Sequence, residues 1–347
     1  MRATKEIFVR IGQREDNAAI LSLLRSTLGE GAISKTPAFW SWKHERNPFG
    51  ASPVLVAEAE SRIIGVRVFM RWRWRSGGNV IDSVRAVDTA TDRDWQGKGI
   101  FTKLTLKLVE EVEKEPVAFV FNTPNRHSGP GYLKMGWSSV GSVTLYVRPC
   151  HPIRILGEQI RRTIREVPTT PADDWNIDER NRAALVLSAQ DPATFLQCRS
   201  SDVDPRLSTD RSLEFLMWRY VDIPELSYSV AIEEEEGTSA CLVHRMVYRG
   251  SLRELRLCEL LTTEAAASVG ILRGLIKDAI HHARPDYVAA MAASGTFAQK
   301  ALQALGFVPI PRLGPLLTVR PLRLPSEIPS PLLRSSWRLA IGDLEIF

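Results

Sequence analysis

The stretch Asp92–Phe101, DRDWQGKGIF, decides how the first half of this chain is interpreted. The residues Thr89-Ala90-Thr91 before it are typical of the end of a strand, and Leu104–Val112 after it repeats apolar residues at helical spacing. Gly97 and Gly99 therefore lie where a strand turns into a helix. The first N–H groups of a helix have no partner within it, and the helix dipole is positive there. Because glycine lets a phosphate approach closely, this stretch predicts a pyrophosphate cradle.

Two common phosphate loops are excluded by the same residues. The chain has no GxxxxGK[ST] motif, and it has no GxGxxG motif with an acidic residue about 20 positions later. A glycine turn that binds no ligand is the alternative. The residues that follow decide between the two interpretations.

Three segments follow the cradle in a fixed order: the β-rich run Val117–Phe121, the turn Asn122–Asn125 and the segment Gly131–Trp137. Together with the cradle they resemble the GNAT superfamily of acyl-CoA-dependent N-acyltransferases. The phosphate loop of that family has the form Q/R-x-x-G-x-G/A, which Gln96–Phe101 resembles, with Phe101 where a small residue is usual. Its later motif, N-x(6)-Y-x-K-x-G-F, is matched with Trp in place of Phe by Asn125, Tyr132, Lys134, Gly136 and Trp137. The resemblance covers roughly residues 6–148.

The resemblance implies an α/β (α+β) domain with a mixed, mostly antiparallel central sheet flanked by helices. It also implies acetyl-CoA as co-substrate and no metal. The strand before the cradle would pair its backbone with the amide arm of CoA, which would enter a splayed gap beside Val117–Phe121. Lys98 would add charge or face solvent. The residues implied in donor binding are Val87, Asp88, Thr89, Ala90, Thr91, Gln96, Gly97, Lys98, Gly99, Ile100, Phe101, Asn122, Asn125 and Tyr132.

Acyl transfer from a thioester to an amine needs a bound donor, a neutral amine and a protonated or stabilised leaving thiolate. The resemblance implies that Tyr132 protonates the thiolate as general acid. Asp88 on the central strand is the candidate general base, with His127 as a second candidate. A chain of water molecules without a dedicated side chain is the alternative.

The second half of the chain repeats the pattern of the first. Phe39–Lys43 recurs as Phe215–Arg219, and Met135-Gly136-Trp137 recurs as Leu305-Gly306-Phe307. A hairpin pattern, a third strand and a helix lie between the two motifs in each half. We therefore expect a tandem duplication of one structural unit.

The two copies differ where the chemistry is expected. Sliding the halves together places Ser268–Ile271 opposite Gln96–Gly99 and Leu302 opposite Tyr132. The branched side chains in that segment would keep a phosphate away. The second copy is therefore expected to keep the fold and to lose the donor site.

We expect three parts: residues 1–150 as the acyl-CoA-binding catalytic domain, 151–204 as a connector, and 205–347 as a degenerate copy that shapes the acceptor cleft. The basic segment Arg154–Arg165 has helical spacing and belongs to the connector. The end of the chain, Trp337–Phe347, is expected to form a strand.

Composition limits the remaining functions. Of the 347 residues, 44% are hydrophobic and 24% charged, as is typical of a soluble globular protein. No apolar run could span a membrane, and the four cysteines have no metal-binding spacing, so a cytoplasmic protein with reduced thiols is expected. The net charge of +5 is scattered, which argues against nucleic-acid binding. Only Arg71–Arg75, RWRWR, concentrates charge; it indicates a strand with a packed face and a solvated face, or a contact with an anionic or aromatic partner.

The sequence thus predicts an N-acetyltransferase that uses acetyl-CoA and acts on a primary amine of a small molecule or amino sugar. Two alternatives stay open: transfer of an aminoacyl or longer acyl group to a larger acceptor, and a non-catalytic CoA-responsive binding protein. The partner expected is the small amine, and a homodimer is left open.

Overall fold

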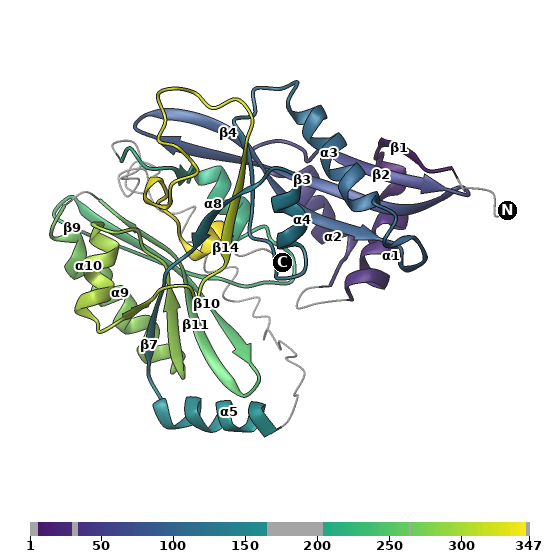
Figure 1. Ribbon diagram of the computed structural model, residues 1–347. Coiled ribbons are helices and arrows are strands. Elements are labelled where there is room, and N and C mark those ends of the chain that lie inside the picture. The colour runs from purple at the N-terminus through teal and green to yellow at the C-terminus, as the bar shows by residue number, and fades with distance from the viewer. Residues whose placement is uncertain (1–5, 30–33, 165–203, 264, 345–347) are drawn as a thin grey trace.

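Two sheets form the protein, and helices flank both of them (Figure 1). The computed structural model describes residues 6–29, 34–164, 204–263 and 265–344. The first sheet has the order β1-β2-β3-β4-β5-β14-β6, with β8 paired to β3, and the second has the order β13-β7-β12-β11-β10-β9. The predicted two-domain α/β fold with mixed, mostly antiparallel sheets is confirmed.

The strands of the first sheet are β1 (Phe8–Ile11), β2 (Val54–Ala59), β3 (Arg62–Ser76), β4 (Asn79–Thr91), β5 (Phe119–Asn122), β14 (Leu316–Pro321), β6 (Ser138–Ser142) and β8 (Ser208–Thr209). Those of the second are β13 (Val308–Ile310), β7 (Leu145–Pro149), β12 (Tyr287–Ala290), β11 (Leu252–Thr262), β10 (Thr238–Arg249) and β9 (Ser229–Glu235).

The helices of the first half are α1 (Asn17–Leu28), α2 (Pro37–Trp40), α3 (Ile100–Val112) and α4 (Gly129–Lys134), with short turns η1 (Arg14–Asp16), η2 (Ser41–Glu45) and η3 (Arg93–Trp95). The later helices are α5 (Pro152–Ile164), α8 (Leu213–Tyr220), α9 (Ser268–Ala283), α10 (Phe297–Ala304) and α11 (Ile341–Leu344), with the turn η5 (Arg334–Ser336). Within the described ranges, every helix falls short of the length or apolarity that a membrane crossing needs.

The RWRWR segment of β3 has one packed face and one polar face. Trp72 and Trp74 are buried in the core between β3 and the helices on one face of the sheet. The three arginines between and beside them form ion pairs of 2.6–2.7 Å, Arg71 with Glu115, Arg73 with Asp82 and Arg75 with Asp210. The alternation of side chains along a strand therefore explains why tryptophans and arginines alternate in this segment.

Each sheet contains strands from both halves of the chain; besides the short β8, one central strand of each sheet comes from the other half. β7, from the first half of the chain, lies between β13 and β12 of the second sheet, and β14, from near the end of the chain, lies between β5 and β6 of the first. Each sheet is complete only with a strand from the other half. The predicted division at residues 150 and 204 stays a prediction, to which the structure adds this exchange.

The repeated tryptophans meet at the junction of the two halves. The Trp42 indole N–H donates to the Trp218 carbonyl oxygen at 2.7 Å, and the Trp218 indole N–H donates to the Trp42 carbonyl oxygen at 2.8 Å. Their rings stack with centroids 4.8 Å apart. Such reciprocal contacts are typical of two equivalent units related by a twofold axis.

A β-bulge recurs at the same place in both sheets. In the β3–β4 pair, Arg67 opposes Thr89 and Val68 opposes Val87, so Asp88 is the extra residue. In the β10–β11 pair the register shifts between Val243, which opposes Glu259, and His244, which opposes Leu257, so Cys258 is the extra residue. A bulge bends the strand and re-aims its side chains.

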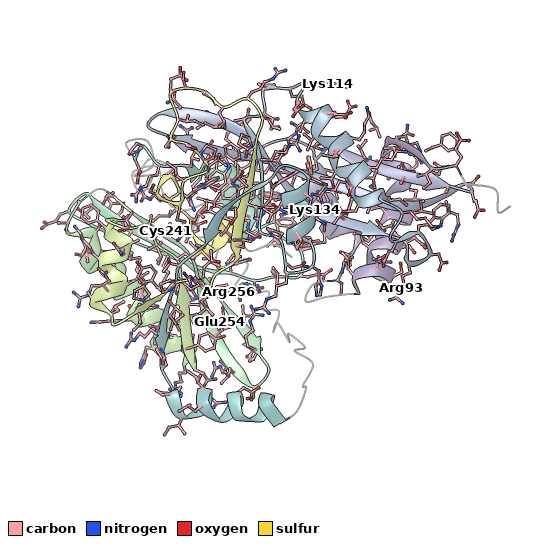
Figure 2. All side chains as sticks on the ribbon, viewed as in Figure 1. Arg93, Lys114, Lys134, Cys241, Glu254 and Arg256 are labelled. Carbon is pink, nitrogen blue, oxygen red and sulfur yellow. The ribbon has the colours of Figure 1, made fainter. Side chains whose placement is uncertain are left out.

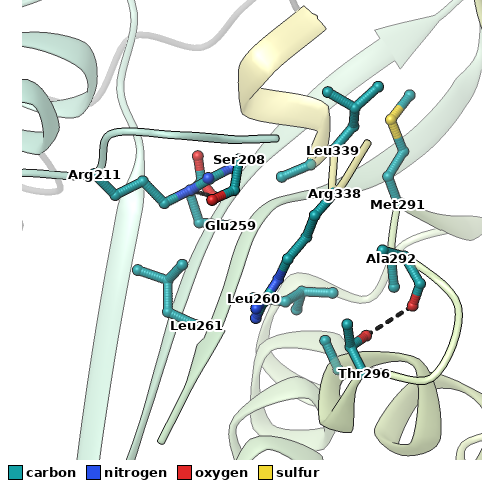
Figure 3. A pocket seen from close by; sticks show the side chains of 13 residues that line it. Ser208, Arg211, Glu259, Leu260, Leu261, Met291, Ala292, Thr296, Arg338 and Leu339 are labelled. Atoms are coloured by element: carbon teal, nitrogen blue, oxygen red, sulfur yellow. Dashed lines mark hydrogen bonds and ion pairs between the residues drawn. The ribbon is translucent and has the colours of Figure 1, made fainter. Parts of the chain in front are cut away.

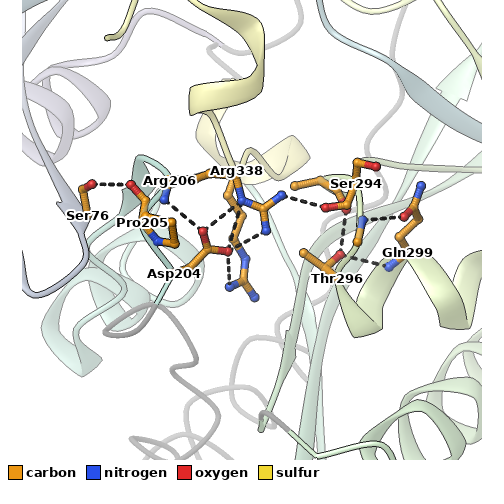
Figure 4. Close-up of polar contacts among 10 residues, drawn as sticks. Ser76, Asp204, Pro205, Arg206, Ser294, Thr296, Gln299 and Arg338 are labelled. Carbon is orange, nitrogen blue, oxygen red and sulfur yellow. Dashed lines mark hydrogen bonds and ion pairs between the residues drawn. The ribbon is translucent and has the colours of Figure 1, made fainter. Parts of the chain in front are cut away.

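The segment around Asp204 joins the halves a second time, through the hydrogen bond from Ser76 to Pro205 (Figure 4). The Asp204 carboxylate accepts hydrogen bonds from Arg206 at 2.6 Å and Arg338 at 3.2 Å, while the Ser76 hydroxyl at the end of β3 donates to the Pro205 carbonyl. Arg206 also donates to the Ser294 carbonyl at 2.7 Å, beyond β12 of the second sheet.

Two sequence expectations are wrong in detail. α9 begins at Ser268 as α3 begins at Ile100, so Ser268–Ile271 lies within the helix, about one turn beyond the position opposite Gln96–Gly99. The expected strand at Trp337–Phe347 is instead a bend into α11, because Asp343 accepts a hydrogen bond from the Ala340 N–H at 2.7 Å and caps a helix. Residues 345–347 lie outside the described residues.

Candidate active site

The predicted cradle has the backbone shape that phosphate binding needs. Gly97 and Gly99 have φ of +74° and +75°, in the left-handed region that favours glycine, and Gly99 caps α3. A Cβ added to either glycine would meet no other atom within 4 Å. The space beside both glycines, just before α3, is therefore open.

Neighbouring side chains hold this loop in shape. The Gln96 side-chain amide donates to the Thr91 carbonyl at 3.2 Å and ties the loop to the end of β4. The Lys98 ammonium donates to the Asp94 carbonyl at 3.1 Å and lies 4.3 Å from the centre of the Trp95 ring. Lys98 is thus folded along the outer side of the loop, and its charge stays next to the cradle.

β4 and β5 separate where the donor arm is expected. They pair in parallel at Val84–Val120 and Arg85–Phe121, and the pairing ends there. The bulge at Asp88 follows in the part of β4 that pairs with β3 but no longer with β5. The predicted gap for the donor arm would lie here, between Val87–Thr91 and the end of β5, and it stays a prediction.

Tyr132 lies at this gap, on α4, and is only 3% exposed. Its hydroxyl oxygen accepts a hydrogen bond of 2.6 Å from the guanidinium of Arg67 on β3. The same guanidinium donates to the Val87 carbonyl at 3.3 Å. Arg67 therefore links the phenol to the strand beside the bulge.

Phe101 departs from the family pattern for a packing reason. Its ring meets the Tyr132 ring edge-on, with centroids 5.6 Å apart. A Cβ on Gly131 would lie 3.3 Å from the Phe101 ring, so a glycine at that position makes room for it. The large side chain of Phe101 therefore packs against Tyr132, the predicted general acid.

Asp88 has two basic partners that were not foreseen. Its carboxylate lies 2.7 Å from the Lys43 ammonium and 2.8 Å from Nε2 of His44, both on η2. Burial raises the pKa of Asp88, but Lys43 and His44 outweigh burial, and the net pKa of this carboxyl is lowered. Burial in turn lowers the pKa of His44, so the neutral ring donates from Nε2 to Asp88, and Nδ1 accepts from the Ser52 hydroxyl at 3.0 Å.

Asn122 and Asn125 make structural hydrogen bonds. The side-chain oxygen of Asn122 accepts from the Thr318 hydroxyl on β14. The side-chain oxygen of Asn125 accepts from the N–H groups of His127 at 3.0 Å and Ser128 at 2.9 Å and so shapes the start of α4. His127 is exposed on this loop, as expected.

The corresponding gap of the second sheet is nearly closed (Figure 3). A cavity of about 50 Å³ remains there, bounded by the end of β11 at Glu259–Leu261, by Met291 after β12 and by the segment Arg338–Ala340. This volume holds little more than a water molecule. Leu302 stands at the position of Tyr132, and Ala267, with φ of −60°, at that of Gly99.

A larger cleft lies on the open face of the second sheet. Its volume is about 460 Å³, and its walls are apolar residues of β7 and β12 together with Ile341 and Leu344 of α11. Glu254 and Arg256 lie at its polar end and are labelled in Figure 2. The structure thus places a cavity of small-molecule size beside the end of the chain.

α11, which walls this cleft, is attached to the first sheet at the point where β4 and β5 separate. Arg85, the last β4 residue paired with β5, donates to the carbonyls of Asp343 and of Leu344, the latter at 2.9 Å. Burial and the nearby charge of Arg219 lower the pKa of Arg85 to about 9. The cleft and the gap therefore share one wall.

Sequence reasoning missed Arg67, Lys43 and His44. Arg67 had one signal, a single cation within the apolar run of β3. Lys43 and His44 had none, because their partner Asp88 lies far along the chain. Among the described residues, no group of three or more His, Cys, Asp or Glu side chains could hold a metal ion.

Comparison with known proteins finds one matching family model in the first half of the chain. Residues 9–140 match the family model described as the acetyltransferase (GNAT) domain. None of the curated protein sequences matches the chain.

Solved structures share the fold over most of the chain. A GCN5-related N-acetyltransferase from Kribbella flavida superposes with a TM-score of 0.55 at 13% identity, covering 93% of this chain and 73% of that one. One from Anabaena variabilis ATCC 29413 gives 0.60 at 12%, covering 91% and 73%. Eis1 from Mycobacterium abscessus gives 0.53 at 12%, covering 91% and 74%.

Proposed function

We propose that this chain, whose residues 9–140 match the acetyltransferase (GNAT) domain, transfers an acetyl group from acetyl-CoA to a primary amine of a small molecule, such as an amino sugar. The observation that carries the proposal is the cradle. Gly97 and Gly99 leave open space before the N-terminus of α3, and Arg67 links Tyr132 to Val87 on β4, the strand that precedes the cradle.

The proposed donor site uses main-chain groups. The N–H groups of Gly97 to Phe101 would bind the pyrophosphate, and the backbone of Val87–Thr91, Asp88 included, would pair with the amide arm. Asn122 and Asn125 would border the arm on the other side, in addition to the structural bonds that they make.

In the proposed reaction the neutral amine attacks the thioester carbonyl, a C–N bond forms, and the C–S bond breaks with its electron pair leaving on sulfur. Tyr132 gives its hydroxyl proton to the sulfur. The amine loses one proton to solvent, and the phenol recovers one from solvent, so that amide and free thiol result. Asp88 would accept this amine proton, directly or through water, and pass it to solvent; its lowered pKa makes it a weak base and favours the alternative, a chain of water molecules without a dedicated side chain.

The second half would shape the acceptor site. The cleft of about 460 Å³ supports this role because α11 joins it to the gap in the first sheet. Its volume suits a small molecule better than a large acceptor. A cytoplasmic location is part of the same proposal, and a homodimer stays open.

The first test is donor binding. Calorimetric titration with CoA, acetyl-CoA and longer acyl-CoAs should give micromolar affinity for acetyl-CoA. Tighter binding and faster turnover of a longer or aminoacyl donor would favour transfer of such a group to a larger acceptor. No binding of any donor would refute both acetyl transfer and transfer of a longer acyl group.

The second test is turnover, followed as thiol release with a panel of primary amines. Tyr132→Phe should lower kcat by about 100-fold, a typical loss for a general acid, with the affinity for acetyl-CoA unchanged. Tyr146→Phe is the matched control, since this buried tyrosine lies in the second sheet and accepts a hydrogen bond from Gln299 at 2.8 Å. Binding without turnover of any amine would favour the CoA-responsive binding protein.

A further inference from the structure

Arg67 is a fully buried cation at the centre of the candidate site. It projects from β3 and has no exposed surface. No carboxylate among the described residues forms an ion pair with it. Its Nε is buried without a hydrogen-bond partner within the same described set.

Aromatic rings surround this charge in place of a counter-ion. The guanidinium carbon lies 5.0 Å from the centre of the Phe69 ring, 5.7 Å from that of Phe101 and 5.3 Å from that of Tyr132. Such contacts recover only part of the free energy lost on burying a charge. A methionine of similar length would fill the space without that loss, so packing alone does not account for the arginine.

The hydrogen bonds of Arg67 converge on groups next to the reaction. One terminal nitrogen donates to the Tyr132 hydroxyl oxygen at 2.6 Å, and the other donates to the Val87 carbonyl at 3.3 Å. Val87 directly precedes the bulged residue Asp88. The guanidinium therefore fixes the phenol of α4 relative to β4.

The chemistry of the two groups fixes the direction of the phenol proton. A guanidinium only donates, whereas a phenol has one proton and acceptor lone pairs. Arg67 therefore occupies a lone pair of Tyr132, and the phenol cannot give its proton back to Arg67. The O–H bond is left to donate toward another acceptor in the gap.

We propose that Arg67 is a positioning residue for the acid step: it holds the Tyr132 hydroxyl so that its proton points at the leaving sulfur. This inference rests on the proposed function. When the C–S bond breaks and the proton moves to sulfur, Arg67 stays bonded to the phenolate oxygen, and its positive charge faces the negative charge formed there. No proton leaves Arg67.

Among the described residues, no charged group besides Arg67 is in direct contact with the Tyr132 side chain. α3 contributes the Phe101 ring and β4 the Val87 carbonyl. The Trp137 ring packs on the other side, 5.2 Å from the Tyr132 ring, and Arg320 of β14 stacks behind it at 5.4 Å. Arg320 is thus separated from the phenol by an indole.

A double-mutant cycle tests the proposal on the full-length enzyme with acetyl-CoA and the best amine. Arg67→Met should lower kcat by about 10- to 100-fold and change the dissociation constant of acetyl-CoA by less than about threefold. In a Tyr132→Phe background the same change should cost less than about threefold in kcat, since the proton that Arg67 orients is gone. Arg67→Lys, which keeps a donor and a charge, should recover part of the loss and keeps the cycle measurable if the methionine variant does not fold.

Arg245→Met is the matched control, because Arg245 is a buried arginine of the second sheet whose guanidinium lies 5.6 Å from the Tyr228 ring. It should change stability and leave kcat unchanged. Equal losses from Arg67→Met in both backgrounds, or a loss confined to acetyl-CoA binding, would overturn the positioning role and leave the proposed function standing. An unchanged kcat for Tyr132→Phe alone would instead remove the acid step and this inference with it.

Discussion

The two sheets share one backbone irregularity and differ in the side chains around it. Each has a bulge in its central strand, at Asp88 in the first and Cys258 in the second, and in each the parallel partner strand then separates. The first gap faces a glycine cradle, a tyrosine and an arginine. Side chains fill the second gap and leave a cavity of about 50 Å³. The backbone geometry therefore belongs to the fold, and a few side chains decide whether it binds a ligand.

The junction of the two copies should respond most strongly to mutation. Trp42→Ala removes a buried ring and the indole N–H that donates to the Trp218 carbonyl oxygen, while the backbone carbonyl that accepts from Trp218 stays, and it should cost about 3–5 kcal/mol in the free energy of unfolding. Trp218→Ala should cost a similar amount. The double variant should lose less than the sum because the two rings contact each other. Urea denaturation measures all three, and strictly additive losses would contradict a shared contact.

Two matched substitutions compare the cradle with its counterpart. Gly99→Val places a branched residue at φ of +75° and fills the open space in which the proposed pyrophosphate would bind. Losing two charge-assisted hydrogen bonds corresponds to about 3 kcal/mol, or about 100-fold in the dissociation constant of acetyl-CoA. Ala267→Val, at the equivalent and exposed position of α9, should leave this constant unchanged. Equal effects from the two variants would show that the donor site is not where we place it.

Acidification should destabilise the second sheet through His244. Burial lowers the pKa of His244 to about 4, whereas in the unfolded chain this ring takes up a proton near pH 6.5. Between these values the unfolded state binds more protons, so stability falls as the pH falls. From this group alone the loss between pH 8 and pH 5 is about 2 kcal/mol. His244→Gln should flatten the measured curve in that window, and exposed His127→Gln should leave it as in the unmodified protein.

The exchanged strand should give the smallest effect. Thr318→Val removes the hydroxyl that donates to Asn122 and leaves a buried acceptor without its partner. The expected loss is about 1–2 kcal/mol in the free energy of unfolding, with the affinity for acetyl-CoA within about twofold of the unmodified protein. A large loss of affinity would mean that Asn122 serves the donor more directly than its bond to β14 indicates.

The sequence was sufficient wherever local chemistry determines local structure. A glycine pair between a strand and a helix has few other uses, so Gly97 and Gly99 were located correctly. The repeat of Phe39–Lys43 as Phe215–Arg219 also predicted the duplication. The alignment of α9 with α3 was wrong by about one turn. Apolar residues at helical spacing repeat after each turn, so two such helices also align well when one is shifted by a turn.

What the sequence could not supply depends on contacts between distant segments. Lys43 and His44 acquire their role only when η2 lies against Asp88 on β4. Arg67 looks like an ordinary strand residue until α4 brings Tyr132 to it. The strand exchange has no local signal either, since β7 and β14 are short apolar strands that could pair with several neighbours.

The placement of β14 also bears on how the protein emerges from the ribosome. Residues 316–321 fill the space between β5 and β6, so the first sheet cannot close while only its own half has been translated. Until then two strand edges lack their partner, a state that invites association with other chains. Binding of the proposed acetyl donor is thereby delayed until translation has passed residue 321, and a product truncated before β14 would carry the glycine loop in an unfinished sheet.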